Sequence, residues 1–456
     1  MPEQEIRILS PTAILGYGFP EASWRAGLER DPHVIAVDAG STDPGPYYLG
    51  AGKSFTDKEA VARDLRLMLT GARARGIPVI IGSAGGAGAR PHLDWTVDIV
   101  REVARSAALS FRLAVIPADI DKDALRASLR AGTLTPVPAA PPATDADIDD
   151  STHVVAQLGV EPVIAALDAG ADVIVTGRAY DPAVFAAVPI RAGFDPALAL
   201  HLGKILECAA IAATPGSGGD CMLGTLRADH FLVEPLNPAR ACTVTSVAAH
   251  TLYEKSDPYH LPGPGGVLDL TATVFEPETD RIVRVRGTTF TPTPYAVKVE
   301  GASPVGYRTL SIAGARDPVF IEQIDDLVDA VHAAVCGNFD HIDPDSYRLQ
   351  LHLYGKNGVL GPLETCTQPS HELGIVIEAV AQTPHLADTV CAFARATLLH
   401  LGYPGRRSTA GNLAFPYSPS DVHAGEVYRF SLFHLLPIDD PTALFPVELI
   451  AIGGEA

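Results

Sequence analysis

Cysteine is scarce in this sequence and is never paired. The six cysteines are scattered between residues 208 and 391, and no two of them form a C-x-x-C motif. In a long chain without export signals, dispersed cysteines are more typical of reduced core thiols than of disulfides or zinc ligands. We therefore expect neither a disulfide framework nor a thiolate metal centre.

Long apolar runs are missing as well. The first residues, MPEQEIRILSPTAIL, lack a basic region followed by an apolar run and a small-residue cleavage site. No uninterrupted apolar stretch reaches the roughly 18 residues that a membrane helix needs. The expectation is a cytoplasmic protein without a signal peptide or a membrane span.

Basic residues are outnumbered by acidic ones. Lys and Arg total 34 against 54 Asp and Glu, so the formal net charge is -20. Nucleic acids and anionic membranes bind basic faces, so neither is expected as a partner. A small acidic substrate is compatible with this charge, because a few local arginines and backbone N–H groups suffice to bind one anion.

The first half of the chain alternates short apolar runs with amphipathic helices. Continuous apolar runs are typical of strands buried on both faces of a parallel sheet. They occur at residues 7–9, 34–37, 79–81, 113–116 and 173–175. Between the second and third runs, a Thr56-x-x-Glu59 capping box and helical spacing of apolar residues predict a helix. This alternation predicts an α/β core over residues 1–223, with a mostly parallel sheet and flanking helices.

The pattern changes at about residue 224. Short β-branched runs between Pro, Gly and Thr turns predict an antiparallel β-rich section over residues 224–337. A polar boundary then precedes two strand patterns and a helix opened by Thr383-Pro384. These predict a small C-terminal α+β domain over residues 345–456.

Three glycine-rich loops interrupt this pattern, at residues 38–46, 82–88 and 214–220. The first two follow buried strands, and ligands of open parallel sheets bind outside the carboxyl ends of strands. Glycines there let backbone N–H groups approach an anion, although they also serve in plain tight turns. The substrate-binding candidates in these loops are Ser41, Thr42, Ser83, Gly85, Gly86, Ser217, Gly218, Gly219 and Asp220. Neither a dinucleotide fingerprint nor a Walker loop is present, so no nucleotide cofactor is expected.

Charged residues accompany the loops. Arg178 follows the run at 173–175, where a guanidinium suits bidentate capture of a substrate carboxylate, and Asp181 is its partner or a base. An inert Arg–Asp pair is the alternative. Asp38 and Asp43 lie in the first loop, where two carboxylates can divide acid and base roles or ligate a hard cation. For both, a turn or helix-capping role is the alternative.

Two histidines and two glutamates complete the candidates. His92, near a predicted helix start, is a candidate acid or base, or a capping or core residue. His250 and Glu254 stand four apart in a predicted helix, so they are candidate joint metal ligands or an ordinary polar pair. Glu207 lies on an apolar helix, where a buried carboxylate needs a partner or a raised pKa. The catalytic candidates are Asp43, Asp181, Glu207, His92 and His250, and the candidate ligands of a divalent metal are Asp38, His250 and Glu254.

Several stretches resemble a known family. VDAGSTDPGPYYLGAGKSFTD, PVIIGSAGGAGA, ADVIVTGRAYDPAVFAA and SVAAHTLYEKSDPYHLPGPGGVLDL together are similar to the acyclic terpene utilisation (AtuA) family over residues 5–315. The tail from about residue 345 resembles a small uncharacterised domain often found beside that family. The resemblance implies a role in the catabolism of branched acyclic acids and assigns no catalytic residue.

A lyase fits these features best. A site rich in carboxylates and donors, without a redox motif, favours a lyase, with hydro-lyase as a candidate subclass, acting on a small hydroxy or unsaturated carboxylate. A metal-dependent amide or lactone hydrolase and a non-catalytic carboxylate-binding subunit stay open as alternatives. A homo-oligomer is expected.

Overall fold

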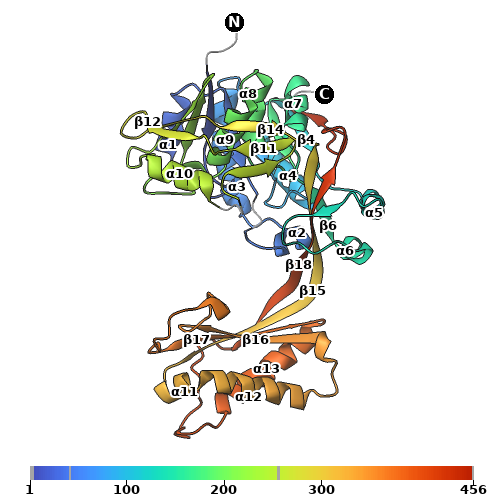
Figure 1. Cartoon of the computed structure of the whole chain (residues 1–456), viewed down its shortest axis with the longest axis vertical. Helices are drawn as coiled ribbons and strands as arrows, with labels where there is room; N and C mark the ends of the chain where they lie inside the picture. The colour runs from blue at the N-terminus through green and yellow to red at the C-terminus, as the bar shows by residue number, and fades with distance from the viewer. Residues whose placement is uncertain (1–4, 41–42, 254–256, 454–456) are drawn as a thin grey trace. The chain divides into compact units, whose positions relative to one another are not determined.

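A computed structural model describes residues 5–40, 43–253 and 257–453 (Figure 1). Contacts divide the chain into two units, Met1–Ser303 with Phe430–Ala456, and Pro304–Arg429. The sequence-based domain limits, near residues 223, 337 and 345, follow composition rather than contacts and stay predictions.

A central sheet organises the first unit. Five of its strands are parallel and adjacent, in the order β1 (Ile6–Ser10), β2 (Val34–Asp38), β3 (Val79–Gly82), β7 (Val173–Thr176) and β4 (Phe111–Ile116). Antiparallel strands extend the sheet at both edges. Beside β1 they are β8 (Met222–Leu226), β9 (Phe231–Pro235), β13 (Val283–Arg286) and β12 (Val274–Pro277), and beside β4 there is β19 (Glu448–Ile452).

Helices cover both faces of this sheet, because alternate strand residues point to opposite sides. One core joins Ile35 and Val37 to α1 (Glu21–Leu28), α3 (Lys58–Arg73) and α4 (Arg90–Ser106). The other joins Val34 and Ala36 to α7 (Val160–Asp168), α8 (Ala183–Arg191) and α9 (Pro196–Leu206). The α/β class is thereby confirmed, with the parallel part restricted to the five central strands.

Shorter elements complete the first unit. A small sheet pairs β10 (His260–Gly263), β11 (Gly266–Asp269) and β14 (Thr289–Pro292). The remaining elements are α2 (Tyr47–Ala51), α5 (Lys122–Arg130), β5 (Thr135–Pro136), α6 (Asp145–Asp150), β6 (His153–Ala156), η1 (Ala209–Ala212) and α10 (Val244–Leu252).

The second unit is an α+β layer. Its sheet is formed by β16 (Tyr347–Tyr354) and β17 (Leu373–Ala381), together with parts of β15 (Ala296–Ala315) and β18 (Asp421–Pro437). Figure 1 shows α11 (Pro318–Glu322), α12 (Ile324–Asn338) and α13 (Pro384–His400) together on one side of β16 and β17. Short turns η2 (Pro344–Ser346) and η3 (Gly361–Leu363) connect these elements.

One local prediction was wrong. The sequence placed a capping box at Thr56 and Glu59, but α3 begins at Lys58 with Asp57 as its N-cap. The Asp57 carboxylate accepts hydrogen bonds from the backbone N–H groups of Glu59 and Ala60. Aspartate at this position satisfies two of the free N–H groups that open a helix, so Thr56 is left outside the helix.

Candidate active site

The turns after β2, β3 and β7 meet at the carboxyl edge of the parallel strands. Ala39 N donates to Gly82 O at 2.9 Å, and Ser83 N donates to Gly177 O at 3.1 Å. Arg178 N in turn donates to Gly88 O at 3.2 Å. The three turns therefore contact one another, and a shared pocket between them for a negatively charged ligand stays a prediction.

Close packing of the turns explains their glycines. A Cβ added at Gly40 would lie 2.2 Å from Ser83 Cβ, and one at Gly88 would lie 2.1 Å from the Arg178 backbone nitrogen. Gly85 and Gly86 contact the chain itself in the same way, at His92 and at the Phe55 ring. These glycines bring one turn against another. Their assignment to a bound anion stays a prediction.

Arg178 is buried and is held by carboxylates of its own chain. Its Nε donates to Glu300 Oε2 at 2.9 Å, and its Nη1 donates to Asp181 Oδ1 at 2.9 Å and to Ser83 Oγ at 3.1 Å. Burial lowers the pKa of Arg178, but the charges of Glu300 and Asp181 more than offset this and raise it above its usual value. Within the described residues, Nη2 has no hydrogen-bond partner.

Glu300 is the partner of Arg178 that sequence reasoning missed. It lies on β15 with 2% of its side chain exposed, accepts a hydrogen bond from Gln157 Nε2 at 2.9 Å, and lies 3.5 Å from Lys298 Nζ. Burial raises the pKa of Glu300, but Arg178 and Lys298 outweigh it and the pKa is lowered. The available signal was weak: Lys298 and Glu300, two apart, share one face of the otherwise apolar stretch at residues 296–302.

The environment of Asp38 disfavours the charged form of its carboxyl group. This residue ends β2, is 4% exposed, and its Oδ1 is buried without a hydrogen-bond partner in the described part of the chain. Burial raises the pKa of Asp38 well above its ordinary value, and the negative charges of Asp181 and Glu207 raise it further against the opposing charge of Arg178. This environment favours the protonated, neutral form of the carboxyl group.

A second ion pair lies on α9 and at its end. Lys204 Nζ donates to Glu207 Oε1 at 2.6 Å, and both side chains are buried. The Lys204 ammonium also stands 4.7 Å from the centre of the Tyr253 ring, which is 4.8 Å from the His250 ring. The sequence required a partner for a buried Glu207, and Lys204 supplies it. Lys204 was not among the predicted site residues.

His250 is neutral in this environment. Burial, followed by the charge of Lys204, lowers the pKa of His250 to about 4, and its Nε2 is buried without a partner in the described residues. Helix α10 ends at Leu252, and Glu254 lies outside the described residues, so their shared metal site stays a prediction. Within residues 5–40, 43–253 and 257–453, no group of three His, Cys, Asp or Glu side chains is arranged to hold a metal ion.

His92 ties its helix to the segment around α2. Its Nε2 lies 3.0 Å from Tyr48 O and 3.1 Å from Lys53 O. Carbonyl oxygens only accept, so Nε2 carries the ring proton and Nδ1 is the unprotonated nitrogen. Burial lowers the pKa of His92, which keeps the ring neutral. These contacts hold the start of α4 against the segment around α2, and a catalytic role for His92 stays a prediction.

The third glycine loop packs against the turn after β1. Gly218 O accepts hydrogen bonds from Ala13 N and Thr12 Oγ1. Asp220 is buried and accepts from Arg240 Nε at 2.8 Å and Asn237 Nδ2 at 2.7 Å. Burial raises the pKa of Asp220, but these hydrogen bonds outweigh it and lower the pKa.

The remaining candidates are less informative. Ser217 Oγ accepts a hydrogen bond from Gly219 N at 3.3 Å. Asp43 is exposed, and Ser41 and Thr42 lie outside the described residues. Tyr180, which was not predicted, is half-buried, and desolvation followed by the charges of Glu207 and Asp181 raises its pKa. Its phenol is therefore a neutral donor beside the carboxylates.

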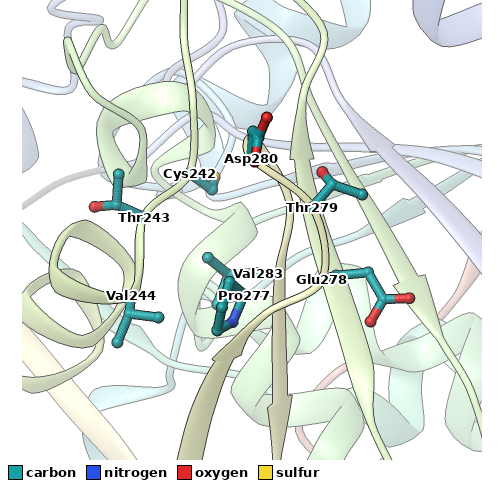
Figure 2. Close-up of a pocket in the computed structure, with 8 residues that line it drawn as sticks. All are labelled: Cys242, Thr243, Val244, Pro277, Glu278, Thr279, Asp280 and Val283. Atoms are coloured by element: carbon teal, nitrogen blue, oxygen red, sulfur yellow. The ribbon is translucent and has the colours of Figure 1, made fainter.

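Asp38, Arg178, Asp181, Lys204, Glu207 and Glu300 are together called the Asp38 cluster below. A surface pocket of the first unit is lined by none of these residues. It has a volume of about 410 Å³ and is formed where the start of α10 faces the turn between β12 and β13 (Figure 2). Its lining includes Cys242, Glu278 and Asp280, and burial raises the pKa of the Cys242 thiol to about 12. A neutral buried thiol beside two exposed acids offers little acid–base chemistry, so we take the Asp38 cluster as the candidate site.

Comparison with known proteins gives one match. The chain matches the model of the acyclic terpene utilisation family protein AtuA over residues 53–220 and 232–419. The chain belongs to the AtuA family. The AtuA match includes the turns at 82–88 and 177–182 as well as Glu300, and it extends beyond residue 315, where the resemblance had been expected to end. No curated protein and no solved structure matches the chain. None of the helices in the described part of the chain is long and apolar enough to cross a membrane.

Proposed function

We propose that this AtuA-family chain is a hydro-lyase acting on a small hydroxy or unsaturated carboxylate in acyclic acid catabolism. The observation that carries the proposal is the buried Asp38 carboxyl, whose Oδ1 has no hydrogen-bond partner among the described residues. A neutral carboxyl in this position can donate a proton that water does not compete for.

The cluster supplies both halves of a dehydration. Glu207 is paired with Lys204 at 2.6 Å, and Asp181 is paired with Arg178 at 2.9 Å. One of these carboxylates removes the proton beside the substrate carboxylate, the electron pair forms the C=C bond, and the C–O bond breaks. Asp38 protonates the departing hydroxyl group, which leaves as water. A proton passing from the base to Asp38 restores the site.

Charge balance supports these protonation states. With Asp38 neutral, the ion pairs found at the site among the described residues join three carboxylates (Asp181, Glu207 and Glu300) to three cations (Arg178, Lys204 and Lys298). Ionising Asp38 would add a further negative charge in a buried position, which desolvation makes unfavourable. The substrate carboxylate is assigned to the Nη2 side of Arg178, because Glu300, Asp181 and Ser83 occupy its other donors.

The proposal is tested with purified protein and a panel of hydroxy and unsaturated carboxylates, with and without divalent metal. Formation of a conjugated product is followed by its far-ultraviolet absorbance. Asp38→Asn is expected to lower kcat by roughly 10²- to 10⁴-fold, the usual contribution of a general acid. The matched control Asp98→Asn removes an exposed carboxylate on α4 and is expected to leave kcat unchanged. Turnover of no compound on the panel, or full activity of Asp38→Asn, would refute the proposal.

Two other functions are distinguishable outcomes. Metal-dependent cleavage of amides or lactones, with stoichiometric bound metal, would indicate a hydrolase instead. Binding of carboxylates without turnover, unaffected by Asp181→Asn, would indicate a non-catalytic subunit. A small acidic substrate, a cytoplasmic location and a homo-oligomeric assembly remain part of the proposal.

A further inference from the structure

The sheet of the second unit has one face without helices of that unit. Thr309, Ser311 and Ala313 on β15 are buried, and Thr309 Oγ1 donates to Asp388 on α13 at 2.6 Å. The alternate residues, beginning with Arg308, therefore point to the other side of the sheet. The register across β15, β17 and β16 fixes which side chains share this outer face.

Two arginines occupy one row of the outer face. Arg308 on β15 lies directly opposite Val380 on β17, and Arg348 on β16 lies opposite the same Val380. Directly opposed residues in antiparallel strands point to the same side of the sheet. The two arginine Cα atoms are therefore separated by two strand spacings, about 10 Å, with an apolar side chain between them.

These arginines line a pocket with a volume of about 390 Å³. A third arginine, Arg429 on β18, also lines it, and Tyr347 and Tyr428 are among its lining residues. The other lining residues are Val305, Asp345, Ser346, Gln350, Glu378, Val380, Ala381, Gln382 and Val427. This volume lies within the range of small-molecule sites, which combine an apolar lining with a few convergent polar groups.

The concentration of positive charge is unusual for this unit. Residues 304–429 contain eight Lys and Arg against fourteen Asp and Glu, yet three of the eight line this pocket with only two acids, Asp345 and Glu378. Glu378 neutralises Arg308 and also contacts His352 Nε2 at 2.9 Å. Arg348 instead donates to the neutral Gln350 Oε1 at 2.8 Å and forms no ion pair with any described residue.

We propose that this pocket of the second unit binds a small organic anion, a carboxylate with a short apolar body. Arg308 is already paired with Glu378, whereas Arg348 forms no ion pair with any described residue, so an anion in the pocket would pair with Arg348. A planar carboxylate suits the fork of a guanidinium, and Val380 and Val427 accommodate the apolar body. The pocket belongs to the second unit, so the proposal is independent of the Asp38 cluster.

The test is isothermal titration calorimetry of the full-length chain with octanoate, 1-octanol and inorganic phosphate. Octanoate is expected to bind, and 1-octanol and phosphate are expected to bind far more weakly. Arg348→Gln is the informative variant, because Arg348 is exposed and its loss breaks no ion pair. It is expected to weaken octanoate binding roughly ten- to a hundredfold, as for the loss of a charge-assisted hydrogen bond. Arg308→Gln is avoided, since it would strand Glu378.

The matched control is Arg316→Gln, an exposed arginine of the same unit that does not line the pocket. It is expected to bind octanoate like the unaltered chain. Equal binding by Arg348→Gln and the unaltered chain would overturn the site. Phosphate binding as tight as octanoate, or no octanoate binding at concentrations on the order of 1 mM, would overturn the assigned ligand class.

Discussion

Replacing Asp38 by asparagine is expected to make the first unit more stable, and increasingly so as the pH rises. The pKa of Asp38 is raised well above its ordinary value of 3.8 by burial and neighbouring carboxylates. The folded chain therefore keeps a proton that the unfolded chain releases. For such a group, the contribution to stability is fully present below the unfolded pKa and is lost as the pH rises towards the folded pKa.

The magnitude follows from linkage. Each pH unit between the unfolded and the folded pKa lowers the free energy of unfolding by about 1.4 kcal/mol. Asparagine does not titrate, so the advantage of Asp38→Asn grows by this amount per pH unit above about pH 4. The gain keeps growing until the pH reaches the folded pKa of Asp38, so the pH at which it levels off measures that pKa.

Urea unfolding followed by tryptophan fluorescence measures this difference in the correct unit. Trp24 and Trp95 are the two tryptophans of the sequence, and both pack in the first unit. Asp220→Asn is the matched control, because Asp220 is equally buried but its pKa is lowered by Arg240 and Asn237. Its stabilisation is complete above pH 3.8, so Asp220→Asn is expected to lose a constant amount, about 1.5–3 kcal/mol, across the same range. A constant difference between Asp38→Asn and the unaltered chain would show that Asp38 is ionised when folded, and the proposed acid would be lost.

Two further substitutions probe the frame around Asp38. Glu300→Gln removes the main partner of the buried Arg178, so the free energy of unfolding is expected to fall by about 3–5 kcal/mol in the same urea assay. A loss below about 1 kcal/mol would show that water reaches the ion pair. Gly40→Ala places a Cβ 2.2 Å from Ser83 Cβ and is expected to cost about 1–3 kcal/mol and to lower any turnover, whereas unchanged stability would mean that the two turns do not pack as described.

The strands of the central sheet were predictable because burial on both faces requires an apolar residue at nearly every position. Strands such as Val34–Asp38 and Val173–Thr176 are buried on both faces and therefore read as unbroken apolar runs. The meeting of their following turns was predictable for the same reason, since parallel strands place their carboxyl ends along one edge. The N-cap of α3 was not, because Thr56 and Asp57 are both good N-cap residues one position apart.

The ion pairs of the site could not be read from the sequence. Glu300 lies 122 residues from Arg178, and neither spacing nor composition connects them. Lys204 was overlooked although it stands only three residues before Glu207, because a single lysine on an apolar helix is usually taken to extend to solvent. Pairings of this kind are set by tertiary contacts, whereas periodicity reports only the burial of a whole face.

The energetic character of the Asp38 cluster supports a chemical role over a structural one. Buried ion pairs such as Arg178–Glu300 and Lys204–Glu207 gain little net stability, since desolvation of both partners offsets their attraction. Asp38 lowers the stability of the fold, because its buried Oδ1 has no hydrogen-bond partner in the described residues. Its charged form is also disfavoured by burial, as its raised pKa shows. A well-packed apolar side chain at this position would be cheaper for folding. A carboxyl group held neutral beside ionised carboxylates is, in contrast, what transfer of a proton to a leaving hydroxyl group requires.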